Sequence, residues 1–194
     1  MGKQDTKLKL LQAFTELVVE NGYQAATTIK IAQLAGVNES SLFRLFGNKK
    51  GLLLALIAQC VHDIDNLQNE QLEQLDLSEC LFQVAQQYQT FMRTHEALVM
   101  VGLKESLQLE EVKEATNKLA IHFKKVVETI LIQRIQTGEI TKKINPKIQA
   151  DNFNWLNFGY FLTQHNAHNS KLSEPKRTDF LREHIHEYLR GGIL

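Results

Sequence analysis

Residues 28–53 constrain the fold of this chain more than any other stretch. They read TIKIAQLAGVNESSLFRLFGNKKGLL and predict two short helices, 28–35 and 39–46, joined by a turn at 36–38. Gly36 falls where the first helix must end in a left-handed conformation, which glycine adopts without steric cost. Two short helices joined by such a turn are typical of the helix-turn-helix motif, whose second helix enters the major groove of DNA. The stretch therefore predicts a DNA-binding head.

The residue types within the two helices support this motif. Thr27 or Thr28 is expected to cap the first helix, and Asn38 the second, by accepting a backbone N–H hydrogen bond. In the second helix, apolar residues at spacings of three and four are expected to pack inward: Leu42, Leu45 and Phe46. Polar residues then remain on the outer face and near the helix start, where base edges would be met: Glu39, Ser40, Ser41 and Arg44.

The pattern continues on both sides of the motif. An amphipathic helix is predicted over 5–21, and a fourth helix opens at the lysine pair 49–50. The stretch resembles the N-terminal domain of the TetR (tetracycline-repressor-type) transcriptional regulators. The residues that carry the resemblance are Phe14, Gly22, Tyr23, Thr28, Ile31, Ala32, Ala35, Gly36, Val37, Ser41, Leu42, Phe43, Phe46, Lys49 and Leu52.

Three residues depart from the usual pattern of that family. Phe43 replaces the usual Tyr, so a phosphate-contacting hydroxyl is lost at this position. Leu45 stands where His or Tyr is common, and Ser40 stands where Gly is frequent. These departures are expected to change which operator sequence is bound rather than whether DNA is bound.

The resemblance also implies which residues of the head contact DNA. Thr28 and Lys49 are assigned to phosphates, since Lys49 arrives with the partly positive start of a helix. Ser41 and Arg44 are assigned to base edges, although Arg44 is equally able to bind a phosphate. Glu39 is able to accept a hydrogen bond from cytosine or to repel wrong sequences. The full predicted set is Thr28, Glu39, Ser40, Ser41, Phe43, Arg44 and Lys49.

The rest of the chain reads as helix throughout. Only two prolines occur, Pro146 and Pro175, and apolar positions recur at three and four, so the expected fold class is all-α with about nine helices. Beyond the head, helices are predicted over 50–74, 78–94, 96–107, 109–136, 146–168 and 174–190. We expect a helix-turn-helix DNA-binding domain over 1–50 and a larger helical effector-binding and dimerisation domain over 51–194.

The last two predicted helices carry the most apolar surface. The run FNWLNFGYFL at 153–162 is apolar almost all round, so its helix must be buried on more than one side. The resemblance implies a four-helix interface between two protomers, although ordinary core would give the same pattern. The residues assigned to this interface are Phe153, Leu156, Tyr160, Phe180, Leu181, His184, Ile185 and Tyr188.

The larger domain implies a small-molecule effector. By resemblance, the effector enters a cavity among the predicted helices from 50–74 to 146–168 and displaces the first of them, which carries the head. The residues assigned to the cavity are Cys60, Ile64, Tyr88, Met92, Met100, Phe123, Val127, Asn152 and Trp155, each of which also fits plain core. Their apolar and aromatic bias favours a lipophilic effector. The expected protein is a homodimeric repressor that binds a palindromic operator and is released by this effector.

Charge is informative only through its distribution. The net charge is zero, yet residues 1–50 hold seven Lys or Arg against four Asp or Glu, and residues 51–80 hold six acids and no base. A basic head followed by an acidic segment suits a protein that offers one end to phosphate. Cys60 and Cys80 lack metal-site spacing, and no signal-peptide run or membrane-length apolar stretch occurs, so a reduced cytoplasmic protein is expected.

Two other classes of function compete with this interpretation. A metal-dependent helical enzyme would use its histidines: His165 and His168 are three apart, and His184 lies two residues from His186. The sequence has no HExxH, phosphate loop or nucleophile elbow, so no cofactor or metal is expected. A helical adaptor that binds protein would need a broad apolar patch on the head, where short polar residues and lysines are found instead.

Overall fold

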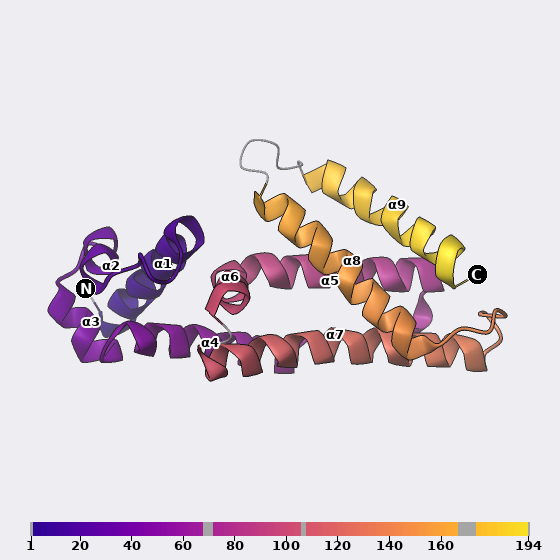
Figure 1. Ribbon diagram of the computed structural model, residues 1–194, viewed down its shortest axis with the longest axis horizontal. Helices are drawn as coiled ribbons and strands as arrows, with labels where there is room; N and C mark the ends of the chain where they lie inside the picture. Colours follow the sequence, from indigo (N-terminus) through magenta and orange to yellow (C-terminus); the bar gives the residue numbers. More distant parts are fainter. Residues whose placement is uncertain (1, 68–71, 106–107, 167–173, 194) are drawn as a thin grey trace. The chain divides into compact units, whose positions relative to one another are not determined.

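The computed structural model describes residues 2–67, 72–105, 108–166 and 174–193, and Figure 1 traces their helices. This described part of the chain contains helices and no strand, which confirms the all-α fold class. Its elements are α1 (Lys3–Asn21), α2 (Thr28–Leu34), α3 (Glu39–Phe46), α4 (Lys49–Asp65), the 3₁₀ turn η1 (Leu72–Gln74), α5 (Leu77–Thr94), α6 (Glu96–Glu105), α7 (Glu110–Gln136), α8 (Pro146–Asn166) and α9 (Glu174–Gly192).

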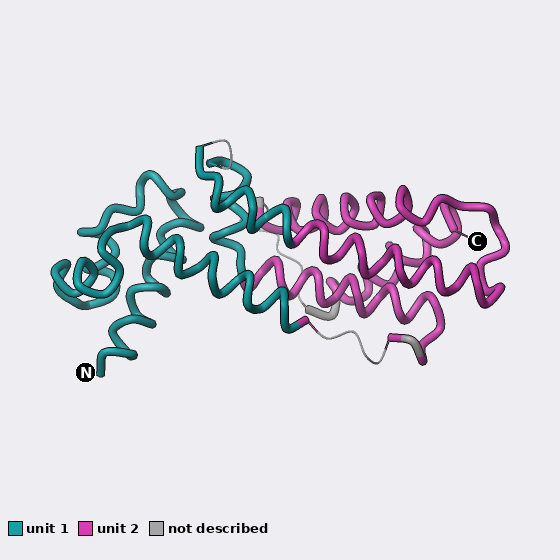
Figure 2. Tube along the Cα trace, turned by 90° about the horizontal axis from the view of Figure 1, so that it is seen from below, with its two compact units in different colours: residues 1–66, 95–118 teal, residues 67–94, 119–194 magenta. Residues whose placement is uncertain are grey.

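The chain divides into two compact units, coloured teal and magenta in Figure 2. Unit 1 comprises residues 1–66 and 95–118, and unit 2 comprises residues 67–94 and 119–194. Unit 1 therefore includes α6 and the start of α7 as well as the head. The predicted domain boundary at residue 50 separates the residues expected to bind DNA from the rest of the chain, and it stays a prediction.

Side-chain caps fix several helix starts. The Thr27 hydroxyl accepts a hydrogen bond from the backbone N–H of Lys30 at 3.4 Å. Asp76 and Asn145 accept in the same way, from the backbone N–H of Glu79 at 2.9 Å and of Lys147 at 3.1 Å. Asn38 departs from expectation, because its side chain makes no capping hydrogen bond at the start of α3. That helix begins instead with its main-chain bond from Ser41 N–H to the Asn38 carbonyl.

The prediction of a helix over 50–74 was too long, because α4 ends at Asp65. The Asn66 side chain donates to the His62 carbonyl at 2.7 Å and competes with continuation of the helix. Asp63 and Asp65 also place negative charge at the negative end of the helix dipole, which disfavours a longer helix.

Each unit has its own core. In unit 1, α1 packs against α2, α3, α4 and α6, and its Leu10 and Phe14 are fully buried. In unit 2, α5 packs against α8 and α9. A polar contact lies within that second core: the Gln89 side chain donates to the Asn157 carbonyl at 2.8 Å, and the Asn157 amide donates to the Phe153 carbonyl at 2.9 Å. Both polar side chains are thus satisfied despite burial. Among the described residues, no helix has the length and apolarity that a bilayer crossing requires.

Candidate nucleic-acid interface

The turn between α2 and α3 has the predicted conformation. Gly36 adopts φ 65°, and its N–H donates to the Gln33 carbonyl at 3.1 Å. The Val37 N–H donates to the Ala32 carbonyl at 3.0 Å. A second glycine, Gly47 at φ 76°, ends α3 in the same left-handed region. Glycine is needed at both places because other residues are strained there.

The outer face of α3 is polar with one aromatic ring. Leu42 is fully buried in the core of unit 1, and Leu45 and Phe46 are half-buried. Among the residues predicted to contact DNA, Ser40, Phe43 and Arg44 are exposed, and Thr28, Glu39, Ser41 and Lys49 are half-buried. The exposed fraction of Phe43 is 48 %, which is high for so large an apolar residue. The structure thus brings Ser40, Phe43 and Arg44 to one accessible helix face.

Two cations near this motif are accessible. Lys30 on α2 and Arg44 on α3 are exposed, and neither makes an ion pair with any residue that the structure describes. Lys30 is not among the residues predicted from the sequence to contact DNA. The available signal was the position of Lys30, which lies two residues after Thr28, the predicted start of α2, and beside the exposed Ile29.

Lys49 lies differently. Its ammonium donates to the Tyr23 carbonyl at 2.9 Å and to the Gln24 carbonyl at 3.5 Å, and it stands 4.2 Å from the centroid of the Tyr23 ring. Burial lowers the pKa of Lys49, and the nearby Glu105 opposes that shift. The ammonium therefore faces the turn between α1 and α2 rather than solvent.

The start of α4 is held close to the end of α3. The Asn48 side chain accepts a hydrogen bond from the Gly51 N–H at 3.0 Å and so caps α4. A Cβ atom at Gly51 would clash with the Phe46 carbonyl oxygen. Only glycine allows this approach, so α3 and α4 are packed in one arrangement.

Two further contacts join this region to the end of α6 and the start of α7, all within unit 1. The Lys50 ammonium pairs with Glu111 at 2.8 Å, and the Gln24 amide donates to Glu105 at 3.1 Å. The hydrogen bond between the first pair raises the pKa of Lys50 and lowers that of Glu111. Both side chains are exposed, so this ion pair is weak.

The residues assigned to an effector cavity in unit 1 are mostly buried. Cys60 and Ile64 on α4 are almost inaccessible, and Met100 on α6 is half-buried. Burial raises the pKa of the Cys60 thiol to about 12, so the thiol is protonated at neutral pH. Three residues further along α4, the Asp63 carboxylate lies 3.1 Å from His95 Nε2.

In unit 2, four of the assigned residues form packed core: Tyr88, Met92, Phe123 and Val127. The rings of Tyr88 and Phe123 meet edge to face at 4.8 Å, and burial raises the pKa of Tyr88. Asn152 and Trp155 differ from expectation, because both side chains are exposed on α8. The apolar run that contains Trp155 carried no sign of which side faces outward.

A groove of about 360 Å³ runs along α7 in unit 2. None of the assigned cavity residues lines it. Its walls are largely apolar, with basic side chains among them: Leu72, Cys80, His122, Lys125, Val126, Thr129, Ile130, Gln133 and Arg134. Arg134 is engaged, since it pairs with Glu139 at 2.8 Å and donates to the Leu75 carbonyl. Lys125 is the exposed cation of the groove.

Comparison with known proteins agrees with the geometry of the head. Residues 10–56 match the family described as bacterial regulatory proteins of the tetR family. The N-terminal domain of the chain is therefore of the tetR-family type. The chain is accordingly a DNA-binding transcriptional regulator.

Individual proteins resemble this chain along most of its length. An uncharacterized HTH-type transcriptional regulator of Bacillus subtilis (strain 168), YvkB, is 27 % identical over 173 residues, which are 88 % of this chain and 89 % of YvkB. The structure of PfmR from Thermus thermophilus has a TM-score of 0.74 at 16 % identity and covers 94 % of each chain. FadR from Bacillus subtilis, solved with stearoyl-CoA, has a TM-score of 0.62 at 21 % identity and covers 92 % of this chain and 96 % of its own. Both structural likenesses concern the fold.

The residues assigned to a dimer interface divide into two groups. Phe153, Tyr160, Leu181, Ile185 and Tyr188 are buried within unit 2. Leu156 and Phe180 are exposed, and His184 is half-buried. The antiparallel packing of α8 and α9 explains this division: Tyr188 donates to the Gln149 carbonyl at 2.7 Å, and the Tyr160 and Phe180 rings stack at 4.5 Å. A role of the whole set in dimerisation stays a prediction.

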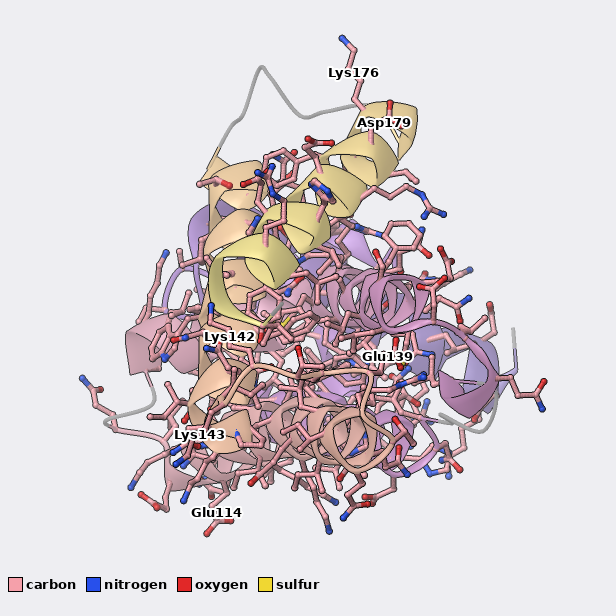
Figure 3. All side chains as sticks on the ribbon, turned by 90° about the vertical axis from the view of Figure 1, so that its right-hand side faces the viewer. Glu114, Glu139, Lys142, Lys143, Lys176 and Asp179 are labelled. Carbon is pink, nitrogen blue, oxygen red and sulfur yellow. The ribbon has the colours of Figure 1, made fainter. Side chains whose placement is uncertain are left out.

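The histidines of the competing enzyme interpretation do not form a shared site among the described residues. His168 lies outside the described residues, and His184 is partly buried with its Nε2 atom in contact with no hydrogen-bond partner that the structure describes. His186 is near Glu183 and Glu187, with the three ligand atoms within 4.8 Å, but all three side chains are exposed on α9. Exposed charged side chains also extend from the first turns of this helix, as Lys176 does in Figure 3.

Proposed function

We propose that this protein is a ligand-responsive repressor that binds a palindromic operator as a homodimer and is released by a small lipophilic effector. The observation that carries the proposal is the outer face of α3, where Ser40, Phe43 and Arg44 are accessible together. Side chains of these types read base edges in the major groove. The proposal assigns no catalytic step and no cofactor to the chain. Because the proposed operator is part of chromosomal DNA, we expect the protein to act in the cytoplasm.

A dimer follows from the energetics of base reading. Each good base contact discriminates by about 1–3 kcal/mol, so one short helix gives limited selectivity. Two recognition helices set about 34–36 Å apart reach successive major grooves of a palindrome. We therefore propose that two copies pair through a twofold axis.

The exposed faces of α8 and α9 support this pairing. Ile148, Trp155 and Leu156 on α8 and Phe180 on α9 are all exposed, and Trp155 reaches 71 %. Apolar surface of this kind commonly marks an interaction site. This set differs from the one predicted from sequence, of which only Leu156 and Phe180 are retained. In our proposal the buried members support these residues from below.

The effector is proposed to be a long-chain acyl thioester or a molecule of similar chemistry. The groove along α7 has a volume typical of ligand sites, with apolar Val126 and Ile130 in its wall and the exposed amine of Lys125 beside them. That combination suits an apolar chain with an anionic head. FadR of Bacillus subtilis, a protein of similar fold, was solved with stearoyl-CoA, which favours this class of ligand.

Release requires that the effector bind one conformation better than the other. We propose that the effector-bound conformation holds the two heads of the dimer at a separation that no longer matches successive major grooves. Operator affinity then falls by the ratio of the effector affinities of the two states.

The proposal is tested by selecting duplexes from random-sequence DNA with the purified protein and measuring binding by fluorescence anisotropy. We expect palindromic sites, a steep loss of affinity with salt, and release by stearoyl-CoA but not by free CoA. Recovery of no preferred sequence would overturn the operator. Failure of stearoyl-CoA to change affinity would overturn only the effector class.

A further inference from the structure

We propose that Lys49 is a positioning residue, which fixes the start of α4 against the turn between α1 and α2. The cation that binds a phosphate on the outer face of α2 and α3 is then Lys30. The inference rests on the DNA-binding function and replaces the phosphate contact that the sequence assigned to Lys49. It concerns residues of unit 1 alone.

The ammonium of Lys49 is already coordinated on three sides. An ammonium has three donors. Two are directed at the carbonyls of Tyr23 and Gln24, at 2.9 and 3.5 Å, and the face of the Tyr23 ring lies 4.2 Å away. That ring is itself buried and meets Phe14 edge to face at 6.2 Å. To reach a phosphate, Lys49 would have to leave all of these groups.

These contacts organise the chain immediately before α2. The Tyr23 carbonyl also accepts the Ala26 N–H at 3.3 Å, and the Ala25 carbonyl accepts the Thr27 N–H at 3.0 Å. Thr27 then caps α2, which carries Thr28 and Lys30. One side chain at the start of α4 thereby anchors the turn that sets where α2 begins.

The position of α2 relative to α3 and α4 matters because phosphate contacts fix the register of the protein on DNA. Gly51 and the cap at Asn48 hold α4 to the end of α3, and Lys49 holds α4 to the start of α2. Binding groups lose function when they shift by more than about 0.5 Å. Loss of Lys49 would leave each helix intact but loosen their relative placement.

Lys30 differs from Lys49 in every relevant respect. It is exposed, it lies on α2 close to Thr28, and it makes no ion pair with the residues that the structure describes. A cation in that state is able to neutralise a phosphate without first breaking an internal contact. Lys30 and Lys49 therefore form a matched pair, because each substitution by Met removes one charge from the same head.

The test compares Lys49→Met with Lys30→Met on a selected operator and on a random duplex over a range of salt. Lys30→Met should lower the log–log salt slope by about 0.9 and weaken both duplexes alike, as loss of one phosphate contact does. Lys49→Met should leave that slope within about 0.3 of wild type but weaken the operator more than the random duplex, by at least about fivefold.

Tyr23→Leu gives a version of the test that changes no charge. It removes the ring but keeps the backbone carbonyls, so it should reproduce the loss of operator preference seen in Lys49→Met. The double variant Lys49→Met, Tyr23→Leu should lose little more preference than either single variant. Tyr23→Phe keeps the ring and should behave as wild type. Lys49→Arg keeps a cation and donors and should restore most of the preference.

Hydrogen exchange separates positioning from global unfolding and from failure of the proposed function, because it needs no DNA. The amides of Ala26 and Thr27 should exchange faster in Lys49→Met and not in Lys30→Met, with the amides of α5 unchanged in both. The inference is overturned if Lys49→Met lowers the salt slope by about 0.9, or if Tyr23→Leu retains full operator preference. Equal protection of Ala26 and Thr27 in all variants would also overturn it.

Discussion

The outer face of α2–α3 and the outer face of α8–α9 are both accessible, yet they expose opposite chemistry. The first offers Lys30, Ser40 and Arg44 around the single exposed ring of Phe43, and the second offers Trp155, Leu156 and Phe180. A surface of cations and hydroxyls is stable in water and gains most from a charged, hydrated partner. An apolar surface gains from being covered by another apolar surface. In our proposal the two faces therefore take two kinds of partner, each on its own unit.

The largest effect should come from placing charge in the apolar face. Trp155→Glu combined with Phe180→Glu should convert the proposed dimer to a monomer, because an uncompensated buried charge costs about 3 kcal/mol or more. Operator affinity should then fall by about 100-fold or more. Sedimentation velocity and fluorescence anisotropy measure the two consequences.

Ile121→Glu is the matched control, since Ile121 on α7 is 64 % exposed but lies on another helix. It should remain dimeric and bind the operator normally. If the Trp155→Glu, Phe180→Glu variant is fully dimeric, the exposed apolar face of α8 and α9 is not the dimer interface.

The next largest effect is expected on the polar face. Arg44→Ala should relax discrimination at one base pair by about 1–3 kcal/mol and leave other positions unchanged. Binding to a panel of operators with single base-pair substitutions measures this. An equal loss for every sequence would instead assign Arg44 to a phosphate.

A smaller gain is expected from Phe43→Tyr. The exposed ring would acquire a hydroxyl able to donate to a phosphate, and a hydrogen bond contributes about 0.5–1.5 kcal/mol, or about two- to tenfold in affinity. The gain should be the same for all duplexes. Unchanged or weaker binding would show that the face of the ring, rather than its edge, meets the DNA.

The smallest expected effect concerns pH and compares one histidine from each unit. Burial lowers the pKa of both His95 and His184, but the carboxylate of Asp63 opposes the shift only at His95. The unfolded chain then binds more protons than the folded one, so stability falls as pH drops below about 6.5. We expect His184→Leu to reduce the loss of Tm between pH 7.5 and 5.5 more than His95→Gln does. Thermal unfolding of the three proteins checks the order, and the reverse order would contradict it.

Local signals in the sequence predicted much of this protein. The turn at Gly36 and the cap at Thr27 were predicted correctly, because each depends on a residue type at one position. The end of α4 was not, because the apolar spacing continues past Asp65 while the Asn66 side chain closes the helix. The groove along α7 was also not predictable, because its residues gather only when α5, η1 and α7 pack together.

The sequence by itself determined the helical class, the helix-turn-helix and the family, since these rest on residue types at short spacing. Only the tertiary structure decided which way individual side chains face. Trp155 was assigned to a cavity and is exposed, and Lys49 was assigned to phosphate and contacts the turn after α1. A helix that is apolar almost all round has no preferred inward side, and a lysine at a helix start has no preferred partner. Such choices depend on neighbours distant in sequence, which spacing along one chain does not encode.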